Sequence, residues 1–284
     1  MMLRTHTIRA SANTSTAVVW AVSLAGSAFI ILPIVFMVGT ALKSDSAVLS
    51  VPVQLIPGEP KFSNFSKATQ LIPFWRQMAN SVLVAGMGAI GTVLSSAMAA
   101  YALARLRVRG MRAVFTIILV TILLPSQVLL VSQFLIFKGL GWYGTYLPLI
   151  VPSWLGGGTF NIFLLRQYFL TLPRELEQAA MLDGAGPLRT FFQVVLPQAA
   201  PALAAVGVLD FVSKWNDFLG PLIYLNETSD YTLPLGLAAF RGIYDTAWNY
   251  LMAASLLSVL PCVVLFLVAQ RWVVRGFAVT TTKG

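Results

Sequence analysis

Residues 77–104 read QMANSVLVAGMGAIGTVLSSAMAAYALA and contain no Asp, Glu, Lys or Arg. A helix needs about 20 predominantly apolar residues to cross the roughly 30 Å hydrocarbon core of a bilayer. This stretch is long enough, so it predicts a membrane-spanning helix. Four more stretches without a charged residue give the same prediction, at residues 10–42, 113–137, 139–165 and 246–270.

A sixth apolar stretch, residues 199–222, contains three charged residues but is otherwise similar. Together the six stretches predict an all-α, polytopic integral membrane protein with six transmembrane helices. The first stretch is too long for the apolar part of a signal peptide, so we expect it to be retained. The expected helices cover roughly residues 17–42, 78–102, 113–134, 146–166, 199–222 and 248–271.

The composition of the 284-residue chain agrees with a membrane protein. Hydrophobic residues make up 57% and charged residues 10%, against about 25% charged in an ordinary soluble chain. A soluble fold needs more surface charge than that, so a soluble enzyme, a disordered tail and a secreted disulfide scaffold are not expected. Cys262 is the only cysteine, so the chain forms no disulfide with itself.

The positions of Lys and Arg predict the orientation and account for the net charge of +9 without a nucleic-acid partner. About two thirds of those outside the spans lie in alternate segments, which the positive-inside rule assigns to the cytoplasm. Both chain ends and loops 103–112 and 167–198 are then cytoplasmic, and loops 43–77, 135–145 and 223–247 face outside. The expected parts are a cytoplasmic tail (1–16), a transmembrane domain (17–272) and a second cytoplasmic tail (273–284).

Two features of the spans bear on helix packing. Small residues stand at every fourth position of the second span, and such a ridge lets another helix approach closely, either within the chain or on a second subunit. The ridge consists of Gly88, Thr92, Ser96 and Ala100. Pro125, Gly156-Gly157-Gly158 and other breakers interrupt several spans, which suits helices that bend during transport and equally reflects the ordinary composition of membrane helices.

The fifth span carries charge inside the membrane. Asp210, Lys214 and Asp217 stand at i, i+4 and i+7, so a continuous helix places them on one face. A charged side chain at mid-membrane costs roughly 2.5–3.5 kcal/mol on insertion scales, so these three are expected to face a polar cavity, one another or a partner chain. A functional site and a ladder that satisfies only itself remain alternatives.

Loop 167–198 has the pattern of two short amphipathic helices. Pro173 suits the first position of one helix and Gly184 its end. The apolar face of this helix consists of Leu172, Leu176, Ala179 and Ala180.

A second helix is expected from Pro187 to Pro197. Its apolar stripe can rest on the bilayer interface, cover the inner ends of the chain's own helices, or dock into a groove on a soluble partner. The stripe consists of Leu188, Phe191, Phe192 and Val195.

The same loop resembles that of a known family. Residues 176–185 read LEQAAMLDGA and are followed by Phe192, Leu196-Pro197 and Pro201, a pattern similar to the EAA loop of ABC importer permeases. The family's Glu of Glu-Ala-Ala stands here as Gln178, which keeps hydrogen-bonding capacity but not charge. Other stretches resemble the permeases of maltose-type carbohydrate or glycerol-phosphate importers: Asn80-Ser81, Trp215-Asn216-Asp217-Phe218, Pro221-Leu222 and residues 231–237.

The resemblance implies a type I ABC importer permease fold and a subunit of an ATP-driven importer in the cytoplasmic (inner) membrane of a prokaryote. The partners it implies are a second membrane permease, two ATP-binding subunits, an extracytoplasmic solute-binding protein and the lipid bilayer. The chain contains no Walker A sequence, so ATP and magnesium are expected on the partner ATPase subunits. No cofactor, metal or catalytic residue is expected on this chain.

The resemblance also assigns residues to roles. The helix before Gly184 corresponds to the coupling helix that fits a cleft on the ATPase, with Arg174, Glu177, Gln178, Ala179, Ala180, Leu182, Asp183, Gly184 and Ala185 as its contact residues. In the fifth span an aromatic plane and polar groups suit a sugar, whereas Lys214 equally suits a phosphate. The substrate-path candidates are Asp210, Lys214, Trp215, Asn216 and Asp217, with packing as the alternative role of Trp215.

Two functions of other classes compete with this prediction. A membrane enzyme acting on lipid needs positioned acids, bases or metal ligands, and the only histidine, His6, lies in the N-terminal tail. A stand-alone secondary transporter or channel works without an ATPase and is favoured by inverted repeats, which the sequence does not show. The importer permease is therefore the main prediction, and the solitary transporter is the alternative.

Overall fold

The structure is a computed structural model that describes residues 8–50, 55–106, 108–242 and 246–281. These residues are helical apart from turns, loops and an isolated antiparallel bridge between Arg241 and Thr246. The chain divides into two compact units, Met1–Leu71 with Phe240–Leu257, and Ile72–Ala239 with Ser258–Gly284. The predicted tails fall partly outside the described residues, and the helices at the two ends begin at Ile8 and end at Thr281.

The first unit contains α1 (Ile8–Ala41), α2 (Asp45–Val48), α3 (Ser63–Leu71) and the first turns of α15 (Trp248–Thr281). Side-chain amides fix the turn after α1, because Asn64 Nδ2 donates to the carbonyls of Ala41 and Lys43, each at 2.8 Å. The large apolar side chains of α1 between residues 18 and 36 lie exposed. Such a surface suits contact with lipid or with another membrane subunit.

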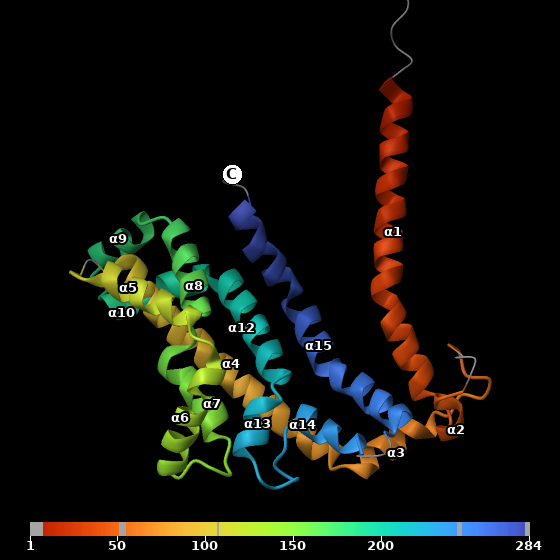
Figure 1. Ribbon diagram of the computed structural model, residues 1–284. Helices are drawn as coiled ribbons and strands as arrows, with labels where there is room; N and C mark the ends of the chain where they lie inside the picture. The colour runs from red at the N-terminus through yellow and green to blue at the C-terminus, as the bar shows by residue number, and fades with distance from the viewer. Residues whose placement is uncertain (1–7, 51–54, 107, 243–245, 282–284) are drawn as a thin grey trace, which may run out of the picture. The chain divides into compact units, whose positions relative to one another are not determined.

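The second unit is arranged around α4 (Phe74–Arg105), a helix of 32 residues (Figure 1). It packs against α7 (Leu147–Gly156), α8 (Thr159–Thr171), α12 (Ala200–Trp215) and α14 (Leu233–Leu237). The core of the unit lies where the C-terminal half of α4 meets α8, α12 and the segment before α12. Its buried residues are Ala97, Ala100, Tyr101, Ile162, Leu165, Phe169, Phe191, Val195, Ala199, Ala202 and Val206.

The small-residue ridge of α4 forms contacts within the chain. A Cβ on Gly88 would lie 2.5 Å from Cδ of Lys214 on α12, and one on Gly91 would overlap the ring of Trp154 on α7. Thr92 and Ser96 are buried between these glycines and the core. Of the two alternatives for the ridge, the structure therefore shows close packing inside the chain.

The third predicted span is not one straight helix. It consists of α5 (Met111–Val120), the short η1 (Thr121–Leu123) and α6 (Ser126–Gly139), and the two halves meet at an angle of 104°. Pro125 lacks an N–H and forces the preceding residue out of helical geometry, and Leu124 is extended as a result. The expectation of a continuous helix over residues 113–134 is wrong for this reason.

The fourth and fifth spans are also interrupted. Gly157 and Gly158 both adopt positive φ (59° and 87°) between α7 and α8, which residues with a Cβ rarely tolerate. In the fifth span, α12 ends at Trp215, and a separate helix, α13 (Leu219–Tyr224), follows. By length and apolarity four helices can cross a membrane among the described residues, or up to six if each bent pair is one span.

Candidate functional site

The predicted coupling helix is present as α9 (Glu175–Leu182). Gly184 ends it with φ +82° in a Schellman motif, where the N–H of Ala185 donates to the carbonyl of Ala180 and the N–H of Gly184 to that of Met181. The predicted stop at Gly184 is confirmed. The predicted start is wrong by two residues, because Pro173 precedes the N-cap Arg174 and the first helical residue is Glu175.

One side chain of α9 faces the chain's own bundle. Glu177 is buried, and its Oε1 lies 2.8 Å from Nε of Arg105, the last residue of α4. Only 4% of the Arg105 side chain and 9% of the Glu177 side chain are exposed. Arg105 Nη2 also donates to the carbonyl of Leu172 at 2.7 Å. One guanidinium therefore holds the segment before α9 and α9 itself.

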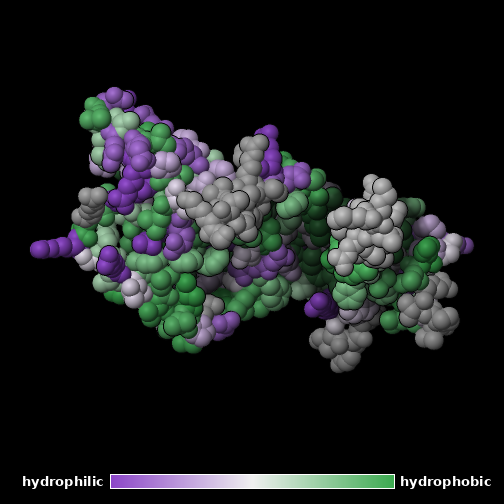
Figure 2. Space-filling view, turned by 90° about the horizontal axis from the view of Figure 1, so that it is seen from above, coloured by the Kyte–Doolittle hydropathy of each residue, from purple (hydrophilic) through white to green (hydrophobic). Residues whose placement is uncertain are grey.

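The other predicted contact residues of α9 present a different surface. Leu182 is 89% exposed and Met181 53%, although both are large and apolar. Ala180 and Ala185 are half-buried, and the exposed members of the predicted set are Arg174, Gln178, Ala179, Leu182, Asp183 and Gly184. Hydrophilic side chains gather over this end of the second unit (purple at the left in Figure 2). The result is a small apolar surface with a polar rim.

The second short helix of the loop lies partly in the core. It runs through α10 (Pro187–Thr190), the π-helix η2 (Phe191–Val195) and α11 (Leu196–Gln198), which meets α12 at 79°. Phe191 and Val195 are buried, with the Phe191 ring 4.9 Å from that of Tyr101, whereas Leu188 and Phe192 are exposed. Half of the stripe thus covers the chain's own helices, and the other half is open.

The substrate-path candidates do not share one environment. Lys214 Nζ lies 3.7 Å from Asp210 Oδ2, and Asn161 Nδ2 on α8 donates to Asp210 Oδ1 at 3.4 Å. The Lys214 side chain runs over Gly88, which has no side chain to exclude it. The structure therefore brings Asp210 and Lys214 together beside α4 and α8.

The remaining candidates lie apart from this pair. Asp217 follows the end of α12 and its Oδ1 accepts the N–H of Gly220 at 3.1 Å, so its predicted place on the face of Asp210 and Lys214 is wrong. Trp215 is buried and stacks on Phe211, as the packing alternative expected. Asn216 is exposed and bonds back to the carbonyl of Val212.

A second polar cluster, which sequence reasoning missed, lies at the N-terminal end of α4. Asn80 Nδ2 donates to the carbonyls of Ser229 and Tyr231, at 2.9 and 3.0 Å. The N–H of Leu233 donates to Ser81 Oγ at 2.7 Å. The further contacts are Gln77 Nε2 to the carbonyl of Thr228 at 3.1 Å and Arg76 Nη2 to Asp230 Oδ1 at 3.4 Å.

The signal for this cluster is a polar face at the start of an apolar helix. Gln77, Asn80 and Ser81 stand at i, i+3 and i+4. Gly236 sits where a Cβ would overlap the Gln77 amide, so a glycine is needed for the close approach. The charge pattern predicts that these segments face outside, so we call residues 76–81 and 228–233 together the outer clamp.

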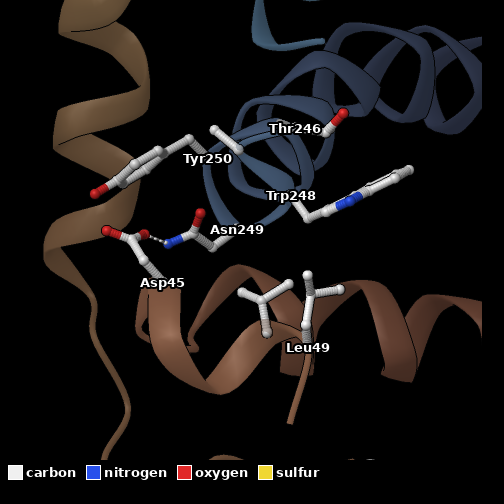
Figure 3. A pocket seen from close by; sticks show the side chains of 8 residues that line it. Asp45, Leu49, Thr246, Trp248, Asn249 and Tyr250 are labelled. Atoms are coloured by element: carbon white, nitrogen blue, oxygen red, sulfur yellow. Dashed lines mark hydrogen bonds between the residues drawn. The ribbon is translucent and has the colours of Figure 1, made fainter. Parts of the chain in front are cut away.

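The first unit has a cavity of about 230 Å³ beside the start of α15 (Figure 3). Asn249 Nδ2 donates to Asp45 Oδ1 at 2.6 Å, so two of its polar groups satisfy one another. Trp248 and Leu49 line it from α15 and from the end of α2. The cavity lies on segments that the charge pattern predicts to face outside.

Residues 91–279 match the family described as binding-protein-dependent transport system inner membrane component. The chain belongs to this family. It is a permease subunit of an ABC importer, which favours the main prediction over a solitary transporter. The matched residues include α9, the Asp210–Lys214 pair and all of the buried core residues named for the second unit.

Related permeases cover nearly the whole chain. The probable ABC transporter permease protein YurM of Bacillus subtilis is 35% identical over 89% of this chain and 83% of its own length. An arabinooligosaccharides transport system permease protein of Halalkalibacterium halodurans is 31% identical over 96% of this chain and 99% of its own. An sn-glycerol-3-phosphate transport system permease protein of Yersinia pestis is 34% identical over 88% and 92%.

A solved structure shows the same fold. A chain from a bacterial ABC transporter involved in the import of the acidic polysaccharide alginate superposes with a TM-score of 0.78 at 23% identity. The match covers 96% of this chain and 100% of that one. The predicted ABC importer permease fold is therefore confirmed, with breaks inside three of the spans.

Proposed function

We propose that this permease forms, with a second membrane permease, the translocation path for a sugar or sugar-like solute. Two ATP-binding subunits complete the complex on the cytoplasmic side, and an extracytoplasmic solute-binding protein completes it on the other. The observation that carries the proposal is α9, a short helix with exposed apolar and small residues at an end rich in polar side chains. A surface of this kind suits a helix that lies in a groove on a partner.

The contact with the ATP-binding subunits uses the exposed surface of α9. Ala179, Asp183 and Gly184 are small or short enough for close approach, and Leu182 supplies an apolar anchor. Gln178 is exposed, so its amide is available for a neutral hydrogen bond where the family has a carboxylate. Glu177 faces Arg105 and contributes to the contact only by holding α9 in place.

ATP and magnesium belong to the partner subunits in this proposal, and the permease carries out no hydrolysis itself. In this proposal the membrane is the cytoplasmic (inner) membrane of a prokaryote, and the positive-inside rule predicts that both chain ends and α9 face the cytoplasm. The outer clamp and the cavity beside α15 then face the binding protein. Rocking of the spans between inward-facing and outward-facing states moves the solute.

The solute class rests on the relatives and on the fifth span. The relatives' names include an oligosaccharide and a glycerol phosphate, and both of these solutes carry hydroxyl groups. Asp210 and Lys214 neutralise each other at 3.7 Å, which leaves hydrogen-bonding groups without a net charge. Such a pair suits a neutral polyol better than a strongly anionic one.

Purification of the tagged chain from native membranes in mild detergent, followed by mass spectrometry, tests the assembly. We expect an ATPase subunit, a second permease and a solute-binding protein to co-purify, and the binding protein can then be screened for its sugar. A Gly184→Val chain should reach the membrane but lose at least about tenfold of the co-purifying ATPase, because φ +82° is strained for a β-branched residue. Gly186→Val has open space and negative φ, so it is the matched control.

Recovery of the wild-type chain alone, active in liposomes without ATP, would contradict the proposal. Equal ATPase recovery with Gly184→Val and Gly186→Val would show that α9 is not the docking helix.

A further inference from the structure

Continuity distinguishes α4 from the spans that pack against it. The segments built from α5 and α6, from α7 and α8, and from α12 and α13 are all interrupted by prolines, glycines or a short loop. Helix α4 runs through 32 residues and contains no proline. A broken span bends at its break, whereas an unbroken helix passes a displacement from one end to the other.

The inner end of α4 is attached to the segment around α9. Arg105 is the last helical residue, and its guanidinium meets both Glu177 Oε1 and the carbonyl of Leu172. Both charged side chains are at least nine-tenths buried. Separation of the pair would leave an uncompensated charge in the protein interior, so α9 cannot move away from α4 without a large penalty.

The outer end of α4 is attached to an outer loop. Side chains on the first two turns of the helix hold four backbone groups of residues 228–233. These are the carbonyls of Thr228, Ser229 and Tyr231 and the N–H of Leu233. Gly236 allows the loop to approach Gln77 closely. The same helix is therefore joined at one end to the coupling segment and at the other to a segment on the opposite side of the membrane.

We infer that α4 is the strut that connects the two sides, and that Arg105 and Glu177 are the positioning residues that make it follow α9. This inference rests on the proposed function, since it requires ATP-binding subunits that move α9. Movement of α9 then displaces α4 as a rigid body. Residues 228–233 move with α4, because the hydrogen bonds of the outer clamp attach them to it. A pair that merely stabilises the fold would leave the response of the outer loop to ATP intact.

The role of the Arg105–Glu177 pair is tested with the assembled transporter in liposomes. ATP, magnesium and vanadate are added as the probe. Cys262 is replaced by Ser, and an environment-sensitive fluorophore is attached at Glu227→Cys, an exposed position just before the outer clamp. In the otherwise unchanged chain we expect a fluorescence change on addition of the probe. In Glu177→Gln we expect that change to fall by roughly tenfold, since residues that act as a unit lose their joint effect when one is removed.

Matched variants distinguish a positioning role of the Arg105–Glu177 pair from a role in stability alone. Glu175→Gln removes the same charge from an exposed position of α9 and should leave the fluorescence change intact. The double exchange Arg105→Glu with Glu177→Arg restores opposite charges and should recover part of the response. If Glu177→Gln fails to assemble, Arg105→Lys retains the charge, loses the bond to Leu172 and is expected to weaken the response.

The outcomes are distinguishable from failure of the proposed function. Absence of ATPase subunits from the wild-type preparation would refute the proposed function itself. A wild-type response that persists undiminished in assembled Glu177→Gln, or in Arg105→Lys if Glu177→Gln does not assemble, would overturn the strut alone.

Discussion

The two ends of α4 are held by different kinds of interaction. At the C-terminal end, which the charge pattern predicts to be the inner one, a single buried ion pair joins Arg105 to Glu177. At the N-terminal end, the predicted outer one, several hydrogen bonds and an exposed ion pair hold residues 228–233. Breaking a buried pair by removing one partner costs about 3–5 kcal/mol, whereas a typical neutral hydrogen bond contributes about 0.5–1.5 kcal/mol. Loss of one residue therefore removes most of the inner attachment, whereas the outer attachment loses a part of its stability with each hydrogen bond removed.

The largest effect is expected at the inner end. Glu177→Ala leaves the Arg105 guanidinium buried without its partner, so we expect a loss of about 3–5 kcal/mol in the free energy of unfolding. Titration of the purified chain with SDS, followed by circular dichroism, measures it. The double variant Arg105→Leu with Glu177→Leu should be more stable than Glu177→Ala, because it removes both charges. A loss in Glu177→Ala no larger than that of an exposed residue would show that the ends do not differ.

The middle of α4 should respond to added volume at one glycine and not at another. A Cβ at Gly91 would overlap the ring of Trp154, whereas one at Gly86 meets nothing within 4 Å. We expect Gly91→Ala to destabilise the chain by about 1–3 kcal/mol through overpacking. Gly86→Ala should be neutral or stabilising by up to about 1 kcal/mol, because alanine favours the helix. The same titration compares them, and equal behaviour would contradict the close packing of α4 on α7.

The outer clamp should show an intermediate, local effect. Ser81→Ala removes the acceptor for the buried N–H of Leu233, which costs about 1–3 kcal/mol when no replacement is found. Hydrogen exchange of residues 228–236 should speed up while exchange around α9 stays the same. Exchange that changes equally at both ends would mean that the loss of stability in Ser81→Ala is not local to the outer clamp.

The smallest effect is expected for the exposed ion pair. Arg76 and Asp230 lie 3.4 Å apart with 63% and 34% of their side chains exposed, so water and salt screen the attraction. Asp230→Asn should change the free energy of unfolding by less than about 1 kcal/mol, and less still at high ionic strength. A loss as large as that of Glu177→Ala would remove the contrast between the two ends.

Much of the fold follows from the sequence because membrane insertion depends on composition over long stretches. The 28 uncharged residues 77–104 leave few alternatives to a spanning helix. The helix expected over 78–102 lies within α4 and ends about one turn or less from each of its ends, at Phe74 and Arg105. The breaks at Pro125 and Gly157 carry visible signals, yet a membrane helix can also retain such residues. Whether it bends depends on neighbours such as Ser96, which packs where a side chain on Gly157 would otherwise lie.

The orientation of α9 could not be predicted from its own pattern. Its apolar residues indicate a buried face, but Leu176 and Ala179 are exposed and Glu177 is buried. The reason is Arg105, which is far away in the sequence and offers a charge partner at the inner end of α4. Local periodicity reports which residues share a face, and a distant partner decides which face turns inward.

The length of α4 has a geometric consequence. At 1.5 Å per residue its 32 residues extend about 48 Å, well beyond the roughly 30 Å of hydrocarbon that a span must cross. A helix of that length lies inclined or projects beyond both surfaces. If it pivots about its midpoint, each 10° of rotation carries its two tips about 4 Å in opposite directions. A helix of this length would then turn a small swing at one end into an opposite swing at the other.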